Sequence, residues 1–157
     1  MKAGIIIVGI VCALGAVQAN EWKPGKEFLR AVRFVESSNG QFVEGDEGQS
    51  LGDFQLSEGA WLDVNNWRKA RYLKMYHYEE AVFNSFINRV YAANYLTILE
   101  SELRRKLGRA PSHAEIYAAY NMGLAMFAQC GFKLSRVNPV TREKCRQIDE
   151  LLAAKRS

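Results

Sequence analysis

The feature that most constrains the fold is a long apolar stripe at helical spacing between residues 79 and 107. Apolar and aromatic side chains recur there every three or four positions, and charged side chains fill positions between them. One face of a helix carries residues at that spacing, so the segment predicts a single long amphipathic helix that forms the spine of the core. The stripe comprises Val82, Phe83, Phe86, Val90, Tyr91, Tyr95, Ile98, Leu99 and Leu103.

Two shorter helices are predicted before this spine. The first runs from Pro24 to about Ser37, and the second begins at Ser57, whose hydroxyl suits a helix N-cap. Between them, residues 40–52 are rich in glycine and predict a loop or a small hairpin.

Two further helices are predicted after the spine. Gly108 ends the spine, and Ser112 with Glu115 has the pattern of a capping box that starts the next helix. A last helix covers about residues 142–154. The sequence therefore predicts a mostly α fold in one domain, because no repeat or linker interrupts residues 20–157.

The first residues have the pattern of a secretory signal. Lys2 precedes an uncharged apolar run from residue 3 to residue 17, and Val-Gln-Ala at residues 17–19 offers the small residues that signal peptidase reads. The run is shorter than the roughly 20 apolar residues that a membrane-spanning helix needs. We therefore expect residues 1–19 to be removed, the mature protein to be periplasmic or secreted, and no stable membrane insertion after cleavage.

The charge of the remaining chain argues against one class of partner. Because Lys2 is the only charged residue in the predicted signal, 20 basic and 17 acidic side chains remain, a net charge of +3. Proteins that bind nucleic acid have much denser basic patches. We therefore expect no nucleic-acid partner.

The cysteines and histidines suggest a structural bridge and no metal site. Cys130 and Cys145 are the two cysteines after the predicted signal, and an isolated pair in an oxidising compartment usually forms a disulfide. The histidines, His77 and His113, are far apart in the sequence and lack the spacing of zinc ligands. We expect a disulfide between the two cysteines, no metal and no other cofactor.

Glu36 is the most informative ionisable residue. It directly follows apolar side chains at helical spacing, and Ser-Ser-Asn-Gly at residues 37–40 then favours a turn. A carboxylate in a last helical turn faces the partial negative charge of the helix C-terminus, and partial burial also disfavours its ionised form. Both effects favour the protonated acid, which is the form that a general acid must have. Taken alone, such a glutamate is more often a solvated side chain.

Three motifs, taken together, strengthen the prediction that Glu36 is catalytic. They are Glu-Ser at residues 36–37, Gly-Asp-Phe-Gln at 52–55, and Ala-Ala-Tyr-Asn-Met-Gly at 118–123. In order and spacing the chain resembles the soluble-lytic-transglycosylase branch of the lysozyme-like superfamily, whose motifs are Glu-Ser, Gly-x-x-Gln and Ala-Tyr-Asn-x-Gly. The resemblance covers about residues 28–123 and implies a lysozyme-like single domain.

The resemblance also implies an activity on peptidoglycan glycan strands. It implies cleavage of the β-1,4 bond between N-acetylmuramic acid and N-acetylglucosamine, with Glu36 as the single catalytic acid and base and with 1,6-anhydro ends as products. Ser37 would form a hydrogen bond near the catalytic carboxyl or the substrate, and Gln55 would contact the acetamido sugar. Tyr120 and Asn121 would line the cleft opposite Glu36, and the tyrosine hydroxyl would orient the carboxyl.

One departure from the family pattern leaves alternatives open. Asp53 and Phe54 stand where the family usually has Leu-Met, and a second carboxylate from Asp53 or Asp46 would favour hydrolysis by an activated water. Otherwise these acids are solvated loop charges. The alternatives are therefore a hydrolytic lysozyme on the same fold, or a non-catalytic protein that binds or assembles the cell wall.

Overall fold

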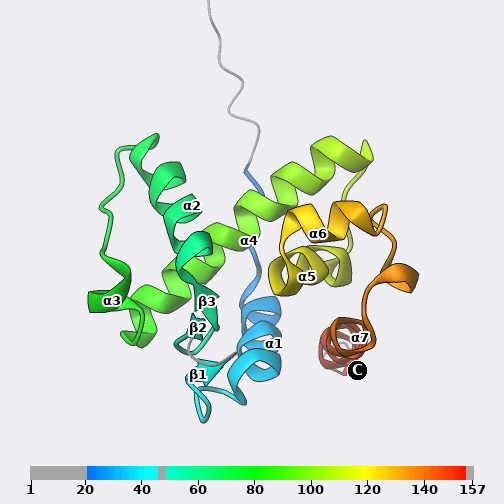
Figure 1. Ribbon diagram of the computed structural model, residues 1–157, viewed down its shortest axis with the longest axis horizontal. Helices are drawn as coiled ribbons and strands as arrows, with labels where there is room; N and C mark the ends of the chain where they lie inside the picture. The colour runs from blue at the N-terminus through cyan, green and yellow to red at the C-terminus, as the bar shows by residue number, and fades with distance from the viewer. Residues whose placement is uncertain (1–20, 46–48, 155–157) are drawn as a thin grey trace, which may run out of the picture.

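The computed structural model describes residues 21–45 and 49–154 (Figure 1). The predicted signal segment and Asp46 lie outside these residues. The described residues form seven α-helices, which confirms the mostly α prediction, and no helix among them is long and apolar enough to cross a membrane. The elements are α1 (Lys26–Ser37), β1 (Glu44–Gly45), β2 (Ser50–Leu51), β3 (Leu56–Ser57), α2 (Glu58–Lys69), α3 (Tyr78–Ala81), α4 (Ser85–Leu107), α5 (His113–Met122), α6 (Leu124–Gln129), the 3-10 turn η2 (Leu134–Arg136) and α7 (Pro139–Ala153).

Helix α4 spans the width of the molecule, with α2 and α3 near one end and α5 and α6 near the other (Figure 1). Both α2 and α5 pack against α4, and α7 packs against α1 and α5. The core between these helices is dominated by aromatic and branched side chains. For example, Trp61 of α2 stacks on Tyr91 of α4 with ring centroids 3.8 Å apart.

The single helix predicted over residues 79–107 is wrong, because the structure contains two helices there. The side chain of Asn84 accepts a hydrogen bond from the backbone N–H of Ile87 at 3.0 Å and starts α4 as a new helix. Asn84 is a good N-cap because its short side chain replaces the missing helical acceptor. The change of direction leaves Phe83 and Phe86 with 54% and 76% of their surface exposed, so these two residues do not belong to the core.

The glycine-rich segment after α1 forms a small antiparallel sheet in the order β1-β2-β3. Glu44 pairs with Leu51 and Ser50 pairs with Ser57, so the sheet connects α1 to α2 directly. The predicted hairpin is therefore present, with a third short strand added to it. Ser57 then caps α2 as predicted, because its side chain accepts a hydrogen bond from the backbone N–H of Ala60 at 3.2 Å.

The predicted capping box at the start of α5 is also present. The Ser112 hydroxyl accepts a hydrogen bond from the Glu115 N–H at 3.1 Å, and the Glu115 carboxylate accepts one from the Ser112 N–H at 2.8 Å. Helix α7 begins at Pro139, earlier than predicted, because the side chain of Asn138 caps it by accepting a hydrogen bond from the N–H of Thr141 at 2.8 Å. These caps fix the two helices that face α1.

The predicted disulfide is absent, since Cys130 and Cys145 are both free thiols in the structure. Cys145 is buried in α7, and its thiol donates to the backbone carbonyl of Ala114 in α5 at 3.5 Å. Burial raises the pKa of the Cys145 thiol to about 12. The Cys145 side chain thus packs as a small apolar group between α5 and α7. Cys130 is the residue directly after α6.

Candidate active site

Glu36 lies in the last turn of α1, as predicted, and only 6% of its side chain is exposed. The helix ends because Ser38 adopts a left-handed conformation and its N–H returns to the carbonyl of Phe34. The two carboxylate oxygens of Glu36 have different neighbours. Oε1 accepts a hydrogen bond from the Tyr117 hydroxyl at 2.6 Å, and Oε2 lies 3.3 Å from the Lys144 ammonium.

Tyr117 holds the inner side of this carboxylate. It is fully buried in α5, and burial, followed by the nearby Glu36 charge, raises its pKa far above the usual value of about 10. The phenol therefore keeps its proton at neutral pH. It is a permanent hydrogen-bond donor that fixes the orientation of Glu36.

A second part of the site is the segment from Gly52 to Gln55. Buried side chains form hydrogen bonds with the backbone of this segment and fix its position. Ser37 donates to the carbonyl of Asp53 at 2.6 Å, and Tyr120 donates to the carbonyl of Phe54 at 2.6 Å. The side chain of Asn88 accepts a hydrogen bond from the Phe54 N–H at 2.9 Å. These three contacts join α1, α5 and α4 to one short turn.

The constrained turn presents Gln55 to a pocket. Gln55 has a positive φ of 48°, and its side-chain N–H groups donate to the carbonyls of Gly52 at 2.9 Å and Phe42 at 3.3 Å. Because the amide nitrogen is engaged in these bonds, the side-chain oxygen of Gln55 is the group left to accept a hydrogen bond from a ligand.

Asn121 is fixed from the side of α7. The hydroxyl of Thr141 donates to the side-chain oxygen of Asn121 at 2.8 Å. That bond leaves the side-chain amide N–H groups of Asn121 as potential donors toward the pocket. Asn121 and Gln55 can therefore offer opposite hydrogen-bonding groups to the same ligand.

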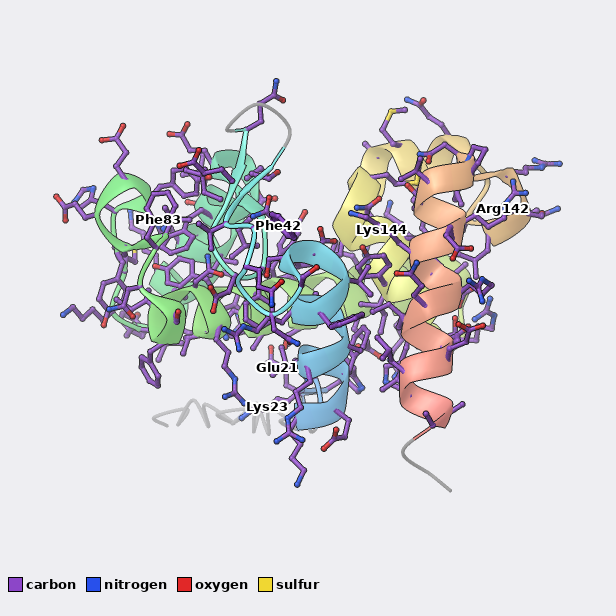
Figure 2. All side chains as sticks on the ribbon, turned by 90° about the horizontal axis from the view of Figure 1, so that it is seen from below. Glu21, Lys23, Phe42, Phe83, Arg142 and Lys144 are labelled. Carbon is purple, nitrogen blue, oxygen red and sulfur yellow. The ribbon has the colours of Figure 1, made fainter. Side chains whose placement is uncertain are left out.

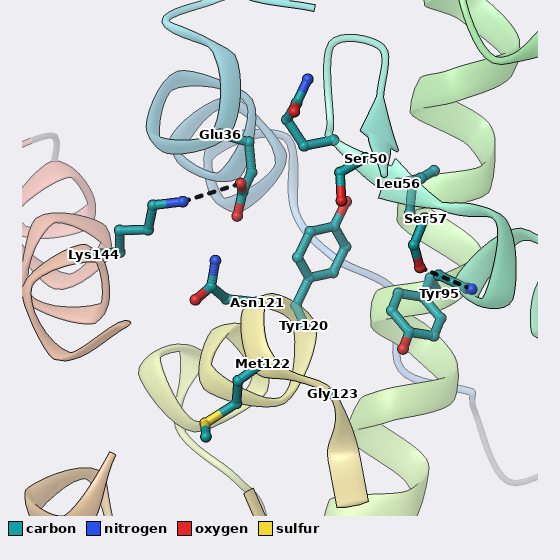
Figure 3. Close-up of a pocket in the computed structure, with 12 residues that line it drawn as sticks. Glu36, Ser50, Leu56, Ser57, Tyr95, Tyr120, Asn121, Met122, Gly123 and Lys144 are labelled. Carbon is teal, nitrogen blue, oxygen red and sulfur yellow. Dashed lines mark hydrogen bonds and ion pairs between the residues drawn. The ribbon is translucent and has the colours of Figure 1, made fainter. Parts of the chain in front are cut away.

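Glu36, Gln55, Tyr120 and Asn121 all line one pocket of about 360 Å³ (Figure 3). Its volume is within the range of pockets that hold small molecules or a segment of a polymer. Glu36 and Lys144 are the charged residues among those that line it, and Tyr95 adds a second tyrosine beside Tyr120, with ring centroids 5.6 Å apart. The remaining lining residues are Ser50, Leu56, Ser57, Ala60, Met122 and Gly123.

Two of the predicted roles are wrong. Ser37 is buried, and its hydroxyl binds the backbone of Asp53 instead of the carboxyl of Glu36, so it has a structural role in the free protein. The hydroxyl of Tyr120 binds the Phe54 carbonyl, and the tyrosine that orients Glu36 is Tyr117. The predicted tyrosine lies about one helical turn from the correct one, because Tyr117 and Tyr120 share a face of α5 at a spacing of three residues.

Asp53 does not face Glu36. Its carboxylate pairs with Arg33 at 2.8 Å and lines a different pocket together with residues of α1 and of the start of α4. The predicted second carboxylate is therefore wrong for Asp53 in this structure. For Asp46 the prediction concerns a residue outside the described part of the chain.

Lys144 is a residue of the site that no sequence motif indicated. This residue lies on α7, beyond the last of the three motifs, and Figure 2 shows it reaching from α7 toward α1. An ammonium beside a carboxylate favours the charged form of that carboxylate. In the free protein Glu36 therefore has a cationic partner, which the sequence did not suggest.

Within the described residues, no three His, Cys, Asp or Glu side chains are grouped in a way that could hold a metal ion. Comparisons of the chain with protein-family models, with curated proteins and with solved structures found no match in any of the three.

Proposed function

We propose that this protein has a lysozyme-like fold and cleaves the β-1,4 bond between N-acetylmuramic acid and N-acetylglucosamine in peptidoglycan. The observation that carries the proposal is that Glu36, Gln55 and Asn121 line the same pocket. These residues come from three separate segments of the chain, and each belongs to one of the motifs shared with lytic transglycosylases. A nearly buried carboxyl beside neutral hydrogen-bonding groups suits cleavage of a glycosidic bond.

The first chemical step is proton donation by Glu36. Because Oε1 accepts a hydrogen bond from the Tyr117 hydroxyl, the proton that Glu36 transfers is on Oε2, the oxygen near Lys144. This proton moves to the glycosidic oxygen as the bond from that oxygen to the anomeric carbon of the muramyl sugar breaks. The acetamido oxygen of the same sugar then stabilises the positive charge on the anomeric carbon.

The second step returns Glu36 to its starting state. The carboxylate takes the proton from the muramyl 6-hydroxyl, and the resulting oxygen attacks the anomeric carbon. This closes a 1,6-anhydro ring and needs no water. One carboxyl group therefore acts first as acid and then as base, and the amide groups of Gln55 and Asn121 are suited to hold the acetamido groups of the sugar in the reactive orientation.

Transglycosylation fits the described pocket better than hydrolysis. A two-carboxylate hydrolase needs a second acid that can activate water close to the scissile bond. Glu36 is the one carboxylate among the described residues that line the pocket, since Asp53 is paired with Arg33 elsewhere. The substrate's own acetamido and hydroxyl groups can supply what a second acid would supply.

The mass of the reaction products tests this proposal. Purified sacculi are digested with the mature protein, and the released muropeptides are analysed by mass spectrometry. We expect fragments with 1,6-anhydromuramyl ends, each lighter by one water than the corresponding reducing fragment. Reducing ends alone would support a hydrolytic lysozyme instead. Binding to sacculi without any released fragment would support a non-catalytic wall protein.

A further inference from the structure

The position of Lys144 raises a problem that the proposed reaction must solve. Its ammonium lies 3.3 Å from Oε2 of Glu36, which is the oxygen that has to carry the proton. The pair is sheltered, because 29% of the lysine side chain and 6% of the glutamate side chain are exposed. An ammonium at this distance opposes protonation of the carboxylate. The cation must therefore leave Oε2 before Glu36 can act as an acid.

No side chain in the described part of the pocket offers Lys144 another anionic partner. The groups that face Glu36 from α5 are the phenols Tyr117 and Tyr120, and burial raises the pKa of both, so they stay neutral. The neighbouring acid on α7, Glu143, is paired with Arg146. If Lys144 moves to a new partner, the bound ligand has to bring it.

Lys144 is well suited to such a movement. A lysine carries its charge on a flexible four-carbon stem, and its ammonium can bind an anion from many directions. Lys144 lines the pocket itself, and Figure 3 shows its side chain pointing toward Glu36. A ligand in the pocket is therefore within reach of the ammonium.

We infer that Lys144 is a specificity-determining residue that binds a carboxylate of the muramyl unit, either on its lactyl group or on its peptide stem. This inference rests on the proposed function and deepens it, because it defines the substrate by its negative charge. When the ammonium pairs with the substrate carboxylate, Oε2 of Glu36 no longer has a cation beside it. The substrate thereby removes the charge that opposes proton donation by Glu36, while a neutral glycan leaves the Lys144 and Glu36 pair intact.

Calorimetry tests this without any cleavage. The disaccharide peptide in which N-acetylglucosamine precedes N-acetylmuramic acid contains no bond of the scissile type, so it binds and is not consumed. Isothermal titration should show that Lys144→Met weakens the binding of this ligand by about tenfold to a hundredfold. Binding of chitobiose, which has no carboxylate, should be unchanged in the same variant. Unchanged binding of the disaccharide peptide, or an equal loss for both ligands, would overturn the inference.

The two sources of the carboxylate are separated by two further ligands. A disaccharide that lacks the peptide keeps a free lactyl carboxylate, and a disaccharide peptide with amidated stem carboxylates has none. If Lys144→Met weakens binding of the first ligand, Lys144 binds the lactyl group; if it weakens binding of the intact peptide form but not of the amidated form, Lys144 binds the stem. Unchanged binding of every carboxylate-bearing ligand would overturn the inference.

Kinetics provides the second arm. The ratio of kcat/KM for sacculi to kcat/KM for chitin oligosaccharides should fall by about tenfold to a hundredfold in Lys144→Met, the loss expected for one charged hydrogen bond. Lys144→Arg should retain most of the ratio. Lys106→Met is the matched control, because it removes the same charge from an exposed position on α4 and should change nothing. An unchanged ratio in an active Lys144→Met protein would overturn the role of Lys144 and leave the proposed function intact.

Discussion

The hydroxyl of Tyr117 donates a hydrogen bond to Oε1 of Glu36 at 2.6 Å, across a separation of 81 positions in the sequence. The contact joins the middle of α5 to the last turn of α1 and is sheltered by the core. It fixes one oxygen of the carboxylate and leaves the other to face the pocket. The orientation of the proposed acid therefore depends on α5 as much as on the helix that carries it.

The hydrogen bond from Tyr117 should matter for turnover. Tyr117→Phe keeps the buried ring and removes the donor, so we expect kcat on sacculi to fall by about tenfold to a hundredfold with little change in KM. Tyr91→Phe is the control, because it also removes a hydroxyl that bonds in the core, to Asn65, and lies outside the pocket. It should lower stability but not the turnover of the folded protein. Equal kcat values for Tyr117→Phe and the wild type would contradict this role.

The raised pKa of Tyr95 should make the protein less stable at high pH. Burial raises the pKa of Tyr95 to about 12, against about 10 in the unfolded chain. Because the folded state holds this proton more tightly, the proton contributes to the free energy of unfolding. The contribution is complete below pH 10 and is lost as the pH rises toward 12. Urea unfolding at pH 9 and pH 11 should show this decrease, and Tyr95→Phe should make it smaller by about 1 kcal/mol. The same decrease in both proteins would show that Tyr95 does not contribute.

Gly52 should tolerate substitution much less than Gly108. Both have positive φ, 79° and 68°, so alanine is strained by about 1 to 2 kcal/mol at either position. A Cβ at Gly52 would also lie 2.4 Å from the Val82 carbonyl and 2.5 Å from the Asn88 side chain, whereas one at Gly108 meets nothing within 4 Å. We expect Gly52→Ala to cost about 1 to 3 kcal/mol more than Gly108→Ala in urea unfolding. Similar losses for the two variants would contradict the close packing around the turn that carries Gln55.

Local sequence patterns predicted the parts of the site that depend on neighbouring residues. Glu36 could be assigned to a helix end because Ser-Ser-Asn-Gly directly follows it, and the start of α5 because Ser112 and Glu115 form a capping box. The break before α4 was missed, since the apolar pattern continues across Asn84 and conceals the cap. A strong N-cap residue inside an apolar stripe was the signal that could have revealed it.

The contacts made by tertiary packing could not be predicted in the same way. Tyr117 and Lys144 approach Glu36 from 81 and 108 positions away, and their proximity follows from how α7 packs against both α1 and α5. Tyr117 left a weak signal, because it shares a face of α5 with Tyr120. Lys144 left none, since a lysine on an amphipathic helix usually faces solvent. The predicted signal segment suggested a disulfide for Cys145, but the packing of α7 on α5 gives that side chain another role.

The most direct test of the proposed catalysis is the release of muropeptides from purified sacculi by Glu36→Gln. The substitution preserves size and the acceptor for Tyr117 but removes the acidic proton, so circular dichroism and urea unfolding should show a folded protein. We expect release to fall by at least about a hundredfold, the lower end of what general acid–base catalysis contributes. Release at the wild-type rate, with the same 1,6-anhydro products, would contradict the central role of Glu36.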